Sequence, residues 1–242
     1  MHWVDVRMFF AAVRFENLTV RELSISGYFR GEVVLIKTHR LSIILGLAAI
    51  VSIAALTPAR ADVDAIAAGC GDCHGANGVS SESDVPTIAG VSAFVTEDYL
   101  YNYRDKARPC HETKYRGGDL DRPATDMCEI AAALSEDDMT AIAEHYASLP
   151  FTAAKQDFDA ALAAVGESIH KRDCAKCHTD NGSNPDDDAG ILAGQWMPYL
   201  QQVFADYMAG DREYAEDKMQ EKLAELSAAD IEALINFYGS QQ

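Results

Sequence analysis

Two segments of the chain, 134–148 and 226–240, show the same pattern of apolar and polar positions. Their apolar residues recur at intervals of three and four, which predicts a helix with one buried face. These residues are Met139, Ile142, Ala143 and Tyr146 in the first segment and Ile231, Leu234, Ile235 and Tyr238 in the second. Ser135 and Ser227 each precede an acidic residue by three positions, as at the start of many capped helices. We therefore expect two equivalent amphipathic helices.

These helices belong to a longer internal repeat. The motif Cys-x-x-Cys-His occurs at 70–74 and again at 174–178, an offset of 104 residues. Further matches are IAG at 88–90 with LAG at 192–194, Tyr99-Leu100 with Tyr199-Leu200, and Met127 with Met219. Because the offset falls to 92 at the methionines, the first copy has 12 extra residues between Gly90 and Met127.

The repeat sets the expected domain organisation. Pro150 ends the helix that closes the first copy, so we place a boundary there. We expect one domain over 62–150 and a second over 151–242, both helical, because no convincing alternating strand pattern occurs. The predicted fold class is all-α.

The first 61 residues have the layout of an export signal. Lys37 and Arg40 precede an apolar run, Leu41–Leu56, and small residues stand at Ala59 and Ala61. This arrangement predicts a secretory signal over about 34–61, cleaved after Ala61, with 1–33 an upstream extension from an early start codon. The alternative is an uncleaved anchor, but the run is shorter than the ~20 residues of a membrane span. We expect a periplasmic protein without a stable membrane span.

Charge limits the possible partners of the exported part. Residues 62–242 contain 13 Lys and Arg against 34 Asp and Glu, a net charge of −21. Such a surface disfavours nucleic acid and anionic membranes, and it suits positively charged protein partners. The alternative interpretation is a general adaptation for solubility or high salt.

The two Cys-x-x-Cys-His motifs are the strongest chemical signal. A structural zinc site would need two cysteine pairs about 15–20 residues apart, and a thioredoxin-like dithiol would need a βαβ context. Covalent haem needs two thiols one helical turn apart and an adjacent imidazole, which this motif supplies. We expect two covalent haem c groups, attached at Cys70 and Cys73 and at Cys174 and Cys177, with His74 and His178 on the iron.

Two methionines are candidates for the opposite side of each iron. Met127 and Met219 occupy equivalent repeat positions, whereas methionines elsewhere, such as Met139, are expected to fill the core. A neutral thioether ligand raises the reduction potential relative to a second histidine. We therefore predict His/Met ligation at both sites.

Other residues near the motifs allow weaker interpretations. The Pro86 carbonyl is a candidate to accept a hydrogen bond from His74 Nδ1, whereas the matching residue in the second copy is Gly190. His111, His145 and His170 are interpreted as surface or capping residues.

Cys110 and Cys128 remain as a pair outside the two motifs. In an oxidising compartment a possible disulfide between them is the simplest expectation. The alternative is that Cys128, next to Met127, is itself a haem ligand, which would suggest sulfur chemistry at that haem.

The tandem arrangement resembles the dihaem class I c-type cytochromes of the c-four type. The second half resembles still more closely the cytochrome subunit of flavocytochrome c sulfide dehydrogenase. This second resemblance covers most of 153–242, in the stretches AKQDFDAALAAVGESIHKRDCAKCH, ILAGQWMPYLQQVFADY, DKMQEKL and FYGSQQ. It implies two class I cytochrome c domains, each wrapped around one haem c, with the ligands given above.

Three functions remain open at this point. The resemblance implies an electron-transfer subunit, not an enzyme on its own, that accepts electrons from a sulfide-oxidising flavin subunit and binds no flavin itself. It would pass them to a soluble cytochrome or an oxidase. The alternatives are a free dihaem periplasmic carrier to a terminal oxidase and a dihaem thiosulfate dehydrogenase.

Overall fold

The structure, a computed structural model, describes residues 59–214 and 216–242. Its α-helices are α2 (Ala59–His74), α3 (Ala93–Arg104), α4 (Met127–Ala132), α5 (Glu136–Ala147), α6 (Ala160–Ile169), α7 (Met197–Ala209), α8 (Asp217–Ala224) and α9 (Ala228–Gly239). Short 3-10 turns lie at Ala76–Gly78, Asp180–Gly182 and Pro185–Asp187, and a π-helical turn, η2, spans His170–Cys174. Within these ranges no strand forms, and the one β-bridge joins Thr113 and Thr125. The predicted all-α class is confirmed.

The expected signal segment lies outside the described residues, except that its last three positions begin helix α2. None of the helices that the structure describes is long and apolar enough to cross a membrane.

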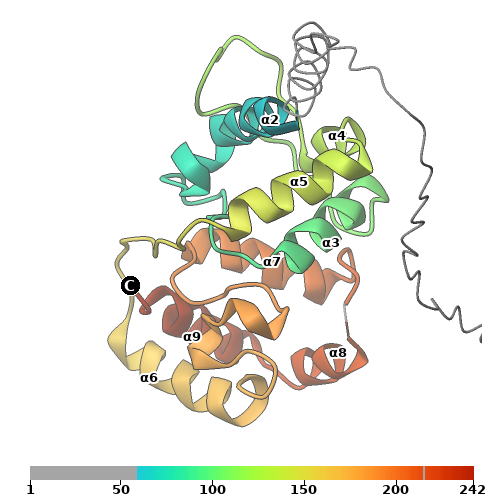
Figure 1. Cartoon of the computed structure of the whole chain (residues 1–242). Helices are drawn as coiled ribbons and strands as arrows, with labels where there is room; N and C mark the ends of the chain where they lie inside the picture. Colours follow the sequence, from blue (N-terminus) through green and yellow to red (C-terminus); the bar gives the residue numbers. More distant parts are fainter. Residues whose placement is uncertain (1–58, 215) are drawn as a thin grey trace, which may run out of the picture. The chain divides into compact units, whose positions relative to one another are not determined.

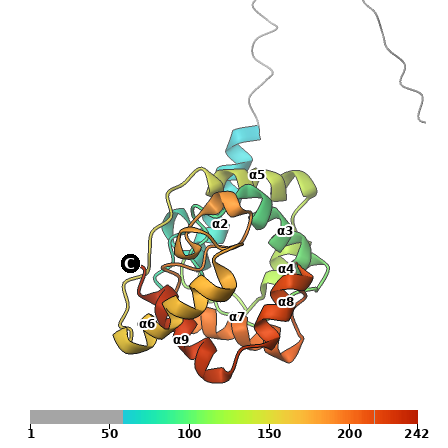
Figure 2. The same cartoon turned by 90° about the horizontal axis from the view of Figure 1, so that it is seen from below.

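The helices form two groups in chain order (Figures 1 and 2). Helices α2 to α5 surround a core cluster of five buried residues, Leu100, Ala131, Met139, Ile142 and Tyr146. Helices α6 to α9 surround a second cluster, which includes Leu200, Phe204, Leu234, Phe237 and Tyr238. The predicted apolar positions of α5 and α9 therefore supply core residues in both groups.

Local sequence determines where α5 and α9 begin. Ser135 and Ser227 each accept a hydrogen bond from the backbone of the third residue of the helix, and Asp138 and Asp230 bond back to the cap. Both predicted capping boxes are thus confirmed. Helix α9 also packs closely on α6 at Gly166, where a Cβ would collide with the Ala233 carbonyl oxygen.

The structure corrects the alignment of the two copies. Helices α3 and α7 begin 104 residues apart. The same offset continues to Arg108 and Arg212, whose backbone N–H groups donate in the same way to the carbonyl oxygens of Asn102 and Asp206. Tyr99 therefore corresponds to Val203, not to Tyr199, and the Tyr-Leu match at an offset of 100 was wrong. The 12 extra residues consequently lie between Arg108 and Met127.

The two groups contact each other through reciprocal segments. The start of α7 reaches the 80–83 loop, where the Trp196 indole donates to the Ser80 carbonyl at 3.0 Å. The start of α3 reaches the corresponding loop of the second copy, where the Ser92 hydroxyl donates to Asp188 at 3.2 Å. The repeat thus produces an approximately two-fold related contact.

Candidate functional site

The first motif, Cys70 to His74, forms the last turn of helix α2. His74 is 8 % exposed, and its Nδ1 lies 2.9 Å from the Pro86 carbonyl oxygen. Burial lowers the pKa of the His74 ring, so the ring is neutral and Nδ1–H donates to Pro86. The predicted Pro86 contact is confirmed, and it leaves the Nε2 lone pair available to a metal.

The second motif begins in the π-helical turn η2 and places His178 in a less supported position. Burial, followed by the nearby charge of His170, lowers the pKa of the His178 ring. No hydrogen bond to this ring contributes to its pKa. At the position of Pro86 stands Gly190, where a Cβ would lie 2.5 Å from the Tyr99 hydroxyl oxygen. Tyr99 from the first copy thus occupies the space that a side chain at 190 would need, which accounts for the departure of the two copies at this position.

The two candidate methionines lie in the first turns of short helices at matching places. Met127 is the first residue of α4, capped by the Asp126 side chain, and Met219 lies in the first turn of α8. Met127 and Cys70 pack against the same core cluster, and Met219 and Cys174 pack against the other. Each core therefore brings a cysteine of the motif and the predicted methionine of the same copy to one apolar environment.

One equivalent tyrosine in each copy adjoins the first cysteine of the motif. Tyr146 is 1 % exposed and its hydroxyl donates to the Ala67 carbonyl at 3.1 Å. Burial, followed by the neighbouring Cys70, raises its pKa, so it stays a neutral donor. Its counterpart Tyr238 is also buried, and its hydroxyl lies 3.0 Å from His170 Nδ1.

His170 is not the surface or capping residue that the sequence suggested. It is 1 % exposed, its ring lies tilted against that of Phe237, and its Nδ1 is hydrogen-bonded to the Tyr238 hydroxyl. The reason is its position in η2, whose wider turn carries it against α9. The other two histidines are more accessible: His111 Nε2 lies 2.9 Å from Asp206, and His145 packs edge-on to Tyr146.

Two buried arginines were missed by the sequence interpretation. Arg108 and Arg212 are each 5 % exposed, at equivalent repeat positions. The Arg108 guanidinium lies 3.9 Å from the centre of the Tyr99 ring, and the Arg212 guanidinium lies 4.5 Å from that of Tyr207. Arg108 Nη1 is buried and without a hydrogen-bond partner. The signal that could have found them is their separation of 104 residues.

These arginines fit a covalently attached haem. A buried guanidinium needs an anionic partner, and no salt bridge to Arg108 or Arg212 is found in the part of the chain that the structure describes. Haem carries two carboxylates, which would satisfy such buried cations. The thiols, the neutral His74 ring and the orphaned donor of Arg108 together match the chemistry of haem c.

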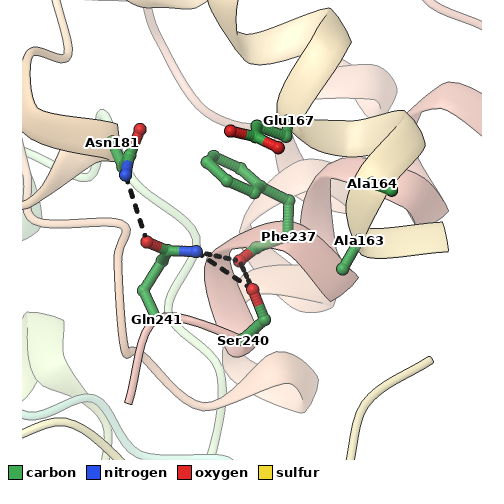
Figure 3. A pocket seen from close by; sticks show the side chains of 7 residues that line it. All are labelled: Ala163, Ala164, Glu167, Asn181, Phe237, Ser240 and Gln241. Carbon is green, nitrogen blue, oxygen red and sulfur yellow. Dashed lines mark hydrogen bonds between the residues drawn. The ribbon is translucent and has the colours of Figure 1, made fainter. Parts of the chain in front are cut away.

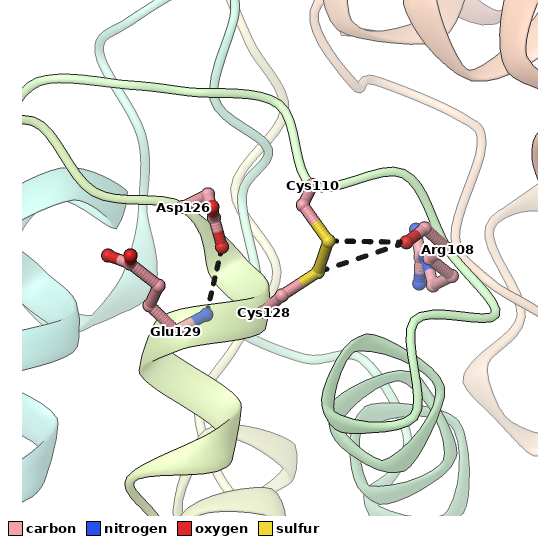
Figure 4. The surroundings of a disulfide bond; sticks show 5 residues. All are labelled: Arg108, Cys110, Asp126, Cys128 and Glu129. Carbon is pink, nitrogen blue, oxygen red and sulfur yellow. Dashed lines mark hydrogen bonds between the residues drawn. A yellow bond between two sulfur atoms is a disulfide. The ribbon is translucent and has the colours of Figure 1, made fainter.

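Cys110 and Cys128 form a disulfide (Figure 4). Both sulfur atoms lie 3.9 Å from the Arg108 carbonyl oxygen, and Cys128 is 4 % exposed. The alternative of Cys128 as a haem ligand is not supported, because its sulfur is bonded to Cys110. For the same reason these cysteines and the adjacent Asp126 do not form a metal site.

A pocket of about 330 Å³ lies between α6 and α9 (Figure 3). It is lined by Ala163, Ala164, Glu167, Asn181, Phe237, Ser240 and Gln241. Asn181 and Gln241 are hydrogen-bonded at 3.3 Å across it. None of its lining residues belongs to the candidate haem ligands.

Comparison with known proteins identifies the family. No family model matches the chain. Cytochrome c4 of Pseudomonas aeruginosa is 30% identical over 183 residues, which are 71% of this chain and 83% of that protein. The chain belongs to the cytochrome c4 family. Cytochrome c4 of Stutzerimonas stutzeri is 29% identical over 180 residues, covering 69% of this chain and 82% of that protein.

Solved structures agree with this membership. The reduced recombinant cytochrome c4 from Pseudomonas stutzeri superposes with a TM-score of 0.61 at 26% identity, covering 76% of this chain and 99% of that one. A thiosulfate dehydrogenase from Marichromatium purpuratum shares the fold, with a TM-score of 0.56 at 22% identity, but only 36% of that chain is covered. As a cytochrome c4 with two Cys-x-x-Cys-His motifs, the chain is a dihaem electron carrier with two covalent haem c groups.

Proposed function

We propose that each half of the chain, 62–150 and 151–242, holds one haem c in a two-centre electron relay. Cys70 and Cys73 bind the first haem through thioether bonds, and His74 and Met127 hold its iron. In the second half the same tasks fall to Cys174 and Cys177 and to His178 and Met219. The observation that carries this proposal is that a motif cysteine and the matching methionine pack against one core cluster in each half.

The protein's own residues suit electron transfer better than bond chemistry. When bound, each haem supplies an iron that accepts and releases one electron. His74 is held in one orientation by the Pro86 carbonyl, and two protein ligands on each iron leave no position for a substrate. Arg108 and Arg212, both buried, would neutralise carboxylates of the two groups. Methionine ligation keeps both potentials high.

Ligand replacement tests this assignment. Met219→Ala should leave both haems attached but remove the weak long-wavelength band of Met-ligated ferric iron from one haem and lower its potential. Met127→Ala should do the same to the other haem, whereas Met208→Ala, at an exposed position, is the matched control. An unchanged band and potential in Met127→Ala or Met219→Ala would refute the corresponding ligand.

We further propose that the relay works in the periplasm and takes its electrons from a sulfide-oxidising flavin subunit. The stretches within 153–242 that resemble the cytochrome subunit of flavocytochrome c support this donor. A flavin releases two electrons, which two one-electron centres can remove in succession. The acidic surface favours a partner with a basic docking face.

A free carrier that delivers electrons to a terminal oxidase is the second candidate, and the cytochrome c4 relatives favour it. A thiosulfate dehydrogenase is the weaker alternative, because its premise was a Cys128 ligand and Cys128 is in a disulfide.

Purification of the native protein separates these functions. Co-purification with a flavoprotein, together with haem reduction by sulfide that requires this flavoprotein, supports the subunit. Isolation as a single chain that sulfide does not reduce, but that exchanges electrons with an oxidase, supports the free carrier. Reduction of the single chain by thiosulfate would support the dehydrogenase.

A further inference from the structure

The segment of the first half that contains the 12 extra residues forms a closed loop. We call residues 109–126 the strap. The disulfide joins Cys110, the second residue of the strap, to Cys128, which lies two positions after the end of the strap. Within the loop, Thr113 and Thr125 exchange two backbone hydrogen bonds, at 2.8 and 2.9 Å. The two ends of the strap are therefore fixed side by side.

The middle of the strap is attached to the first haem motif. Asp72 lies between Cys70 and Cys73, and its carbonyl oxygen accepts a hydrogen bond from Arg116 N–H at 2.8 Å. Its carboxylate accepts a hydrogen bond from Arg122 Nη2 at 2.6 Å and forms an ion pair with that guanidinium. Gly118 has a φ of +63°, and a Cβ there would lie 2.8 Å from this carboxylate. The strap thus lies directly against the segment that ends in His74.

The end of the strap leads directly into Met127. Asp126, its last residue, caps helix α4 through a 2.8 Å bond to Glu129 N–H. Cys128, the neighbour of Met127 on the other side, is buried and covalently tied to Cys110. One continuous segment therefore links the motif with His74 to the candidate ligand Met127.

The second half has no equivalent device. Its segment between Arg212 and Met219 is 12 residues shorter than the segment between Arg108 and Met127, and it contains no cysteine. Met219 is followed by Gln220 where Met127 is followed by Cys128. Only the first half has a covalent restraint next to its methionine.

We propose that the strap and its disulfide are a positioning device that retains Met127 on the first haem iron against competing ligands. The proposal rests on the ligand assignment of the proposed function. A methionine leaves ferric iron when its segment swings away, and a cross-link that closes a loop limits the conformations open to the released segment. Met219 lacks this restraint, so the second haem is the one that exchanges its methionine more readily.

Imidazole is a suitable probe, because it replaces methionine on ferric iron without any change of oxidation state. The Fe–S bond breaks, an Fe–N bond forms, and no proton or electron has to be supplied. The experiment uses ferric holoprotein with the Met219→Ala change, so that the long-wavelength Met–Fe band reports on Met127 alone. The test variant adds Cys110→Ala and Cys128→Ala, which removes the disulfide without leaving a free thiol.

Removal of the disulfide should lower the imidazole concentration that bleaches half of the band by about tenfold. Arg122→Gln keeps the disulfide but breaks the contact with Asp72, and it should give a smaller shift in the same direction. Glu112→Ala, an exposed strap residue, is the control and should give no shift.

The outcomes separate the inference from its premise. If Met127→Ala leaves the band of the first haem intact, the ligand assignment fails. If Met127→Ala removes the band but the disulfide variant and Arg122→Gln titrate like the control, the positioning role is overturned. If the disulfide variant does not mature, Arg122→Gln alone decides: a shift supports the strap and no shift overturns it.

Discussion

Gln195 and Thr87 are joined by two hydrogen bonds across the two halves of the protein. The Thr87 backbone N–H donates to Gln195 Oε1 at 3.1 Å, and Gln195 Nε2 donates to the Thr87 carbonyl at 2.7 Å. Both residues are buried, at 3 % and 2 % exposure. This side chain therefore completes the backbone hydrogen bonding of a residue next to Pro86.

Gln195→Ala should destabilise the protein markedly. The change leaves a buried donor and a buried acceptor of Thr87 without partners, and each such loss costs about 1–3 kcal/mol. We expect the free energy of unfolding of the ferric holoprotein to fall by about 2 kcal/mol or more in denaturant titrations. Gln201→Ala, on the exposed side of α7, is the matched control. Equal stability of the two variants would contradict the role given to Gln195.

A second prediction concerns the contact between Gly190 and Tyr99. Gly190→Ala should cost about 1–3 kcal/mol, because the added Cβ meets the Tyr99 hydroxyl oxygen at 2.5 Å. The next nearest atom, Tyr99 Cζ, lies at an ordinary contact distance of 3.5 Å. In a Tyr99→Phe background most of the cost should therefore disappear.

A double-mutant cycle in thermal unfolding measures this coupling. Similar costs of Gly190→Ala with and without the tyrosine hydroxyl would show that Tyr99 is not what keeps position 190 small.

These two contacts show what the sequence could and could not predict. Ser135 and Ser227 were recognisable as caps because a capping box is local, and the apolar spacing of α5 and α9 is equally local. The Pro86 contact could be predicted because it lies close in sequence to His74. Gln195 and Tyr99 act over about 90 residues or more, on the opposite half of the protein, and no local pattern specifies such contacts.

The register of the repeat was only partly predictable from the sequence. Arg108 and Arg212 share the 104-residue offset of the cysteine motifs, but the match of Tyr99 with Tyr199 suggested an offset of 100 instead. The helix starts and the bonds at Asn102 and Asp206 resolve the register. Burial of a charge without a carboxylate is visible only once the chain is folded.

The unequal support of the two candidate ligand histidines leads to a third prediction. His74 Nδ1–H is held by the Pro86 carbonyl in a buried position, whereas no such bond contributes at His178. In the reduced, diamagnetic holoprotein the His74 Nδ1 proton should exchange with solvent more slowly than that of His178. Nitrogen-edited NMR of the two ring protons in water measures both rates in one sample. Faster exchange at His74 would mean that the Pro86 bond does not persist in solution.

The last prediction is a pH dependence that belongs to His170. Burial lowers the pKa of this ring below its ordinary value near 6.5, so the folded protein binds this proton less readily than the unfolded chain. The associated stability is present above about pH 6.5 and is lost as the pH falls toward the lower pKa of the folded state. His170→Ile places at this position the residue type that the first half has at Ile66.

The variant should therefore lose less stability than the wild type between pH 6.5 and 5. The Tyr238 hydroxyl loses its partner in His170→Ile, but this cost does not change with pH, so the slope isolates the histidine. Thermal unfolding of ferric holoprotein at several pH values supplies that slope. Parallel pH profiles for the wild type and His170→Ile would show that the buried ring does not titrate on unfolding.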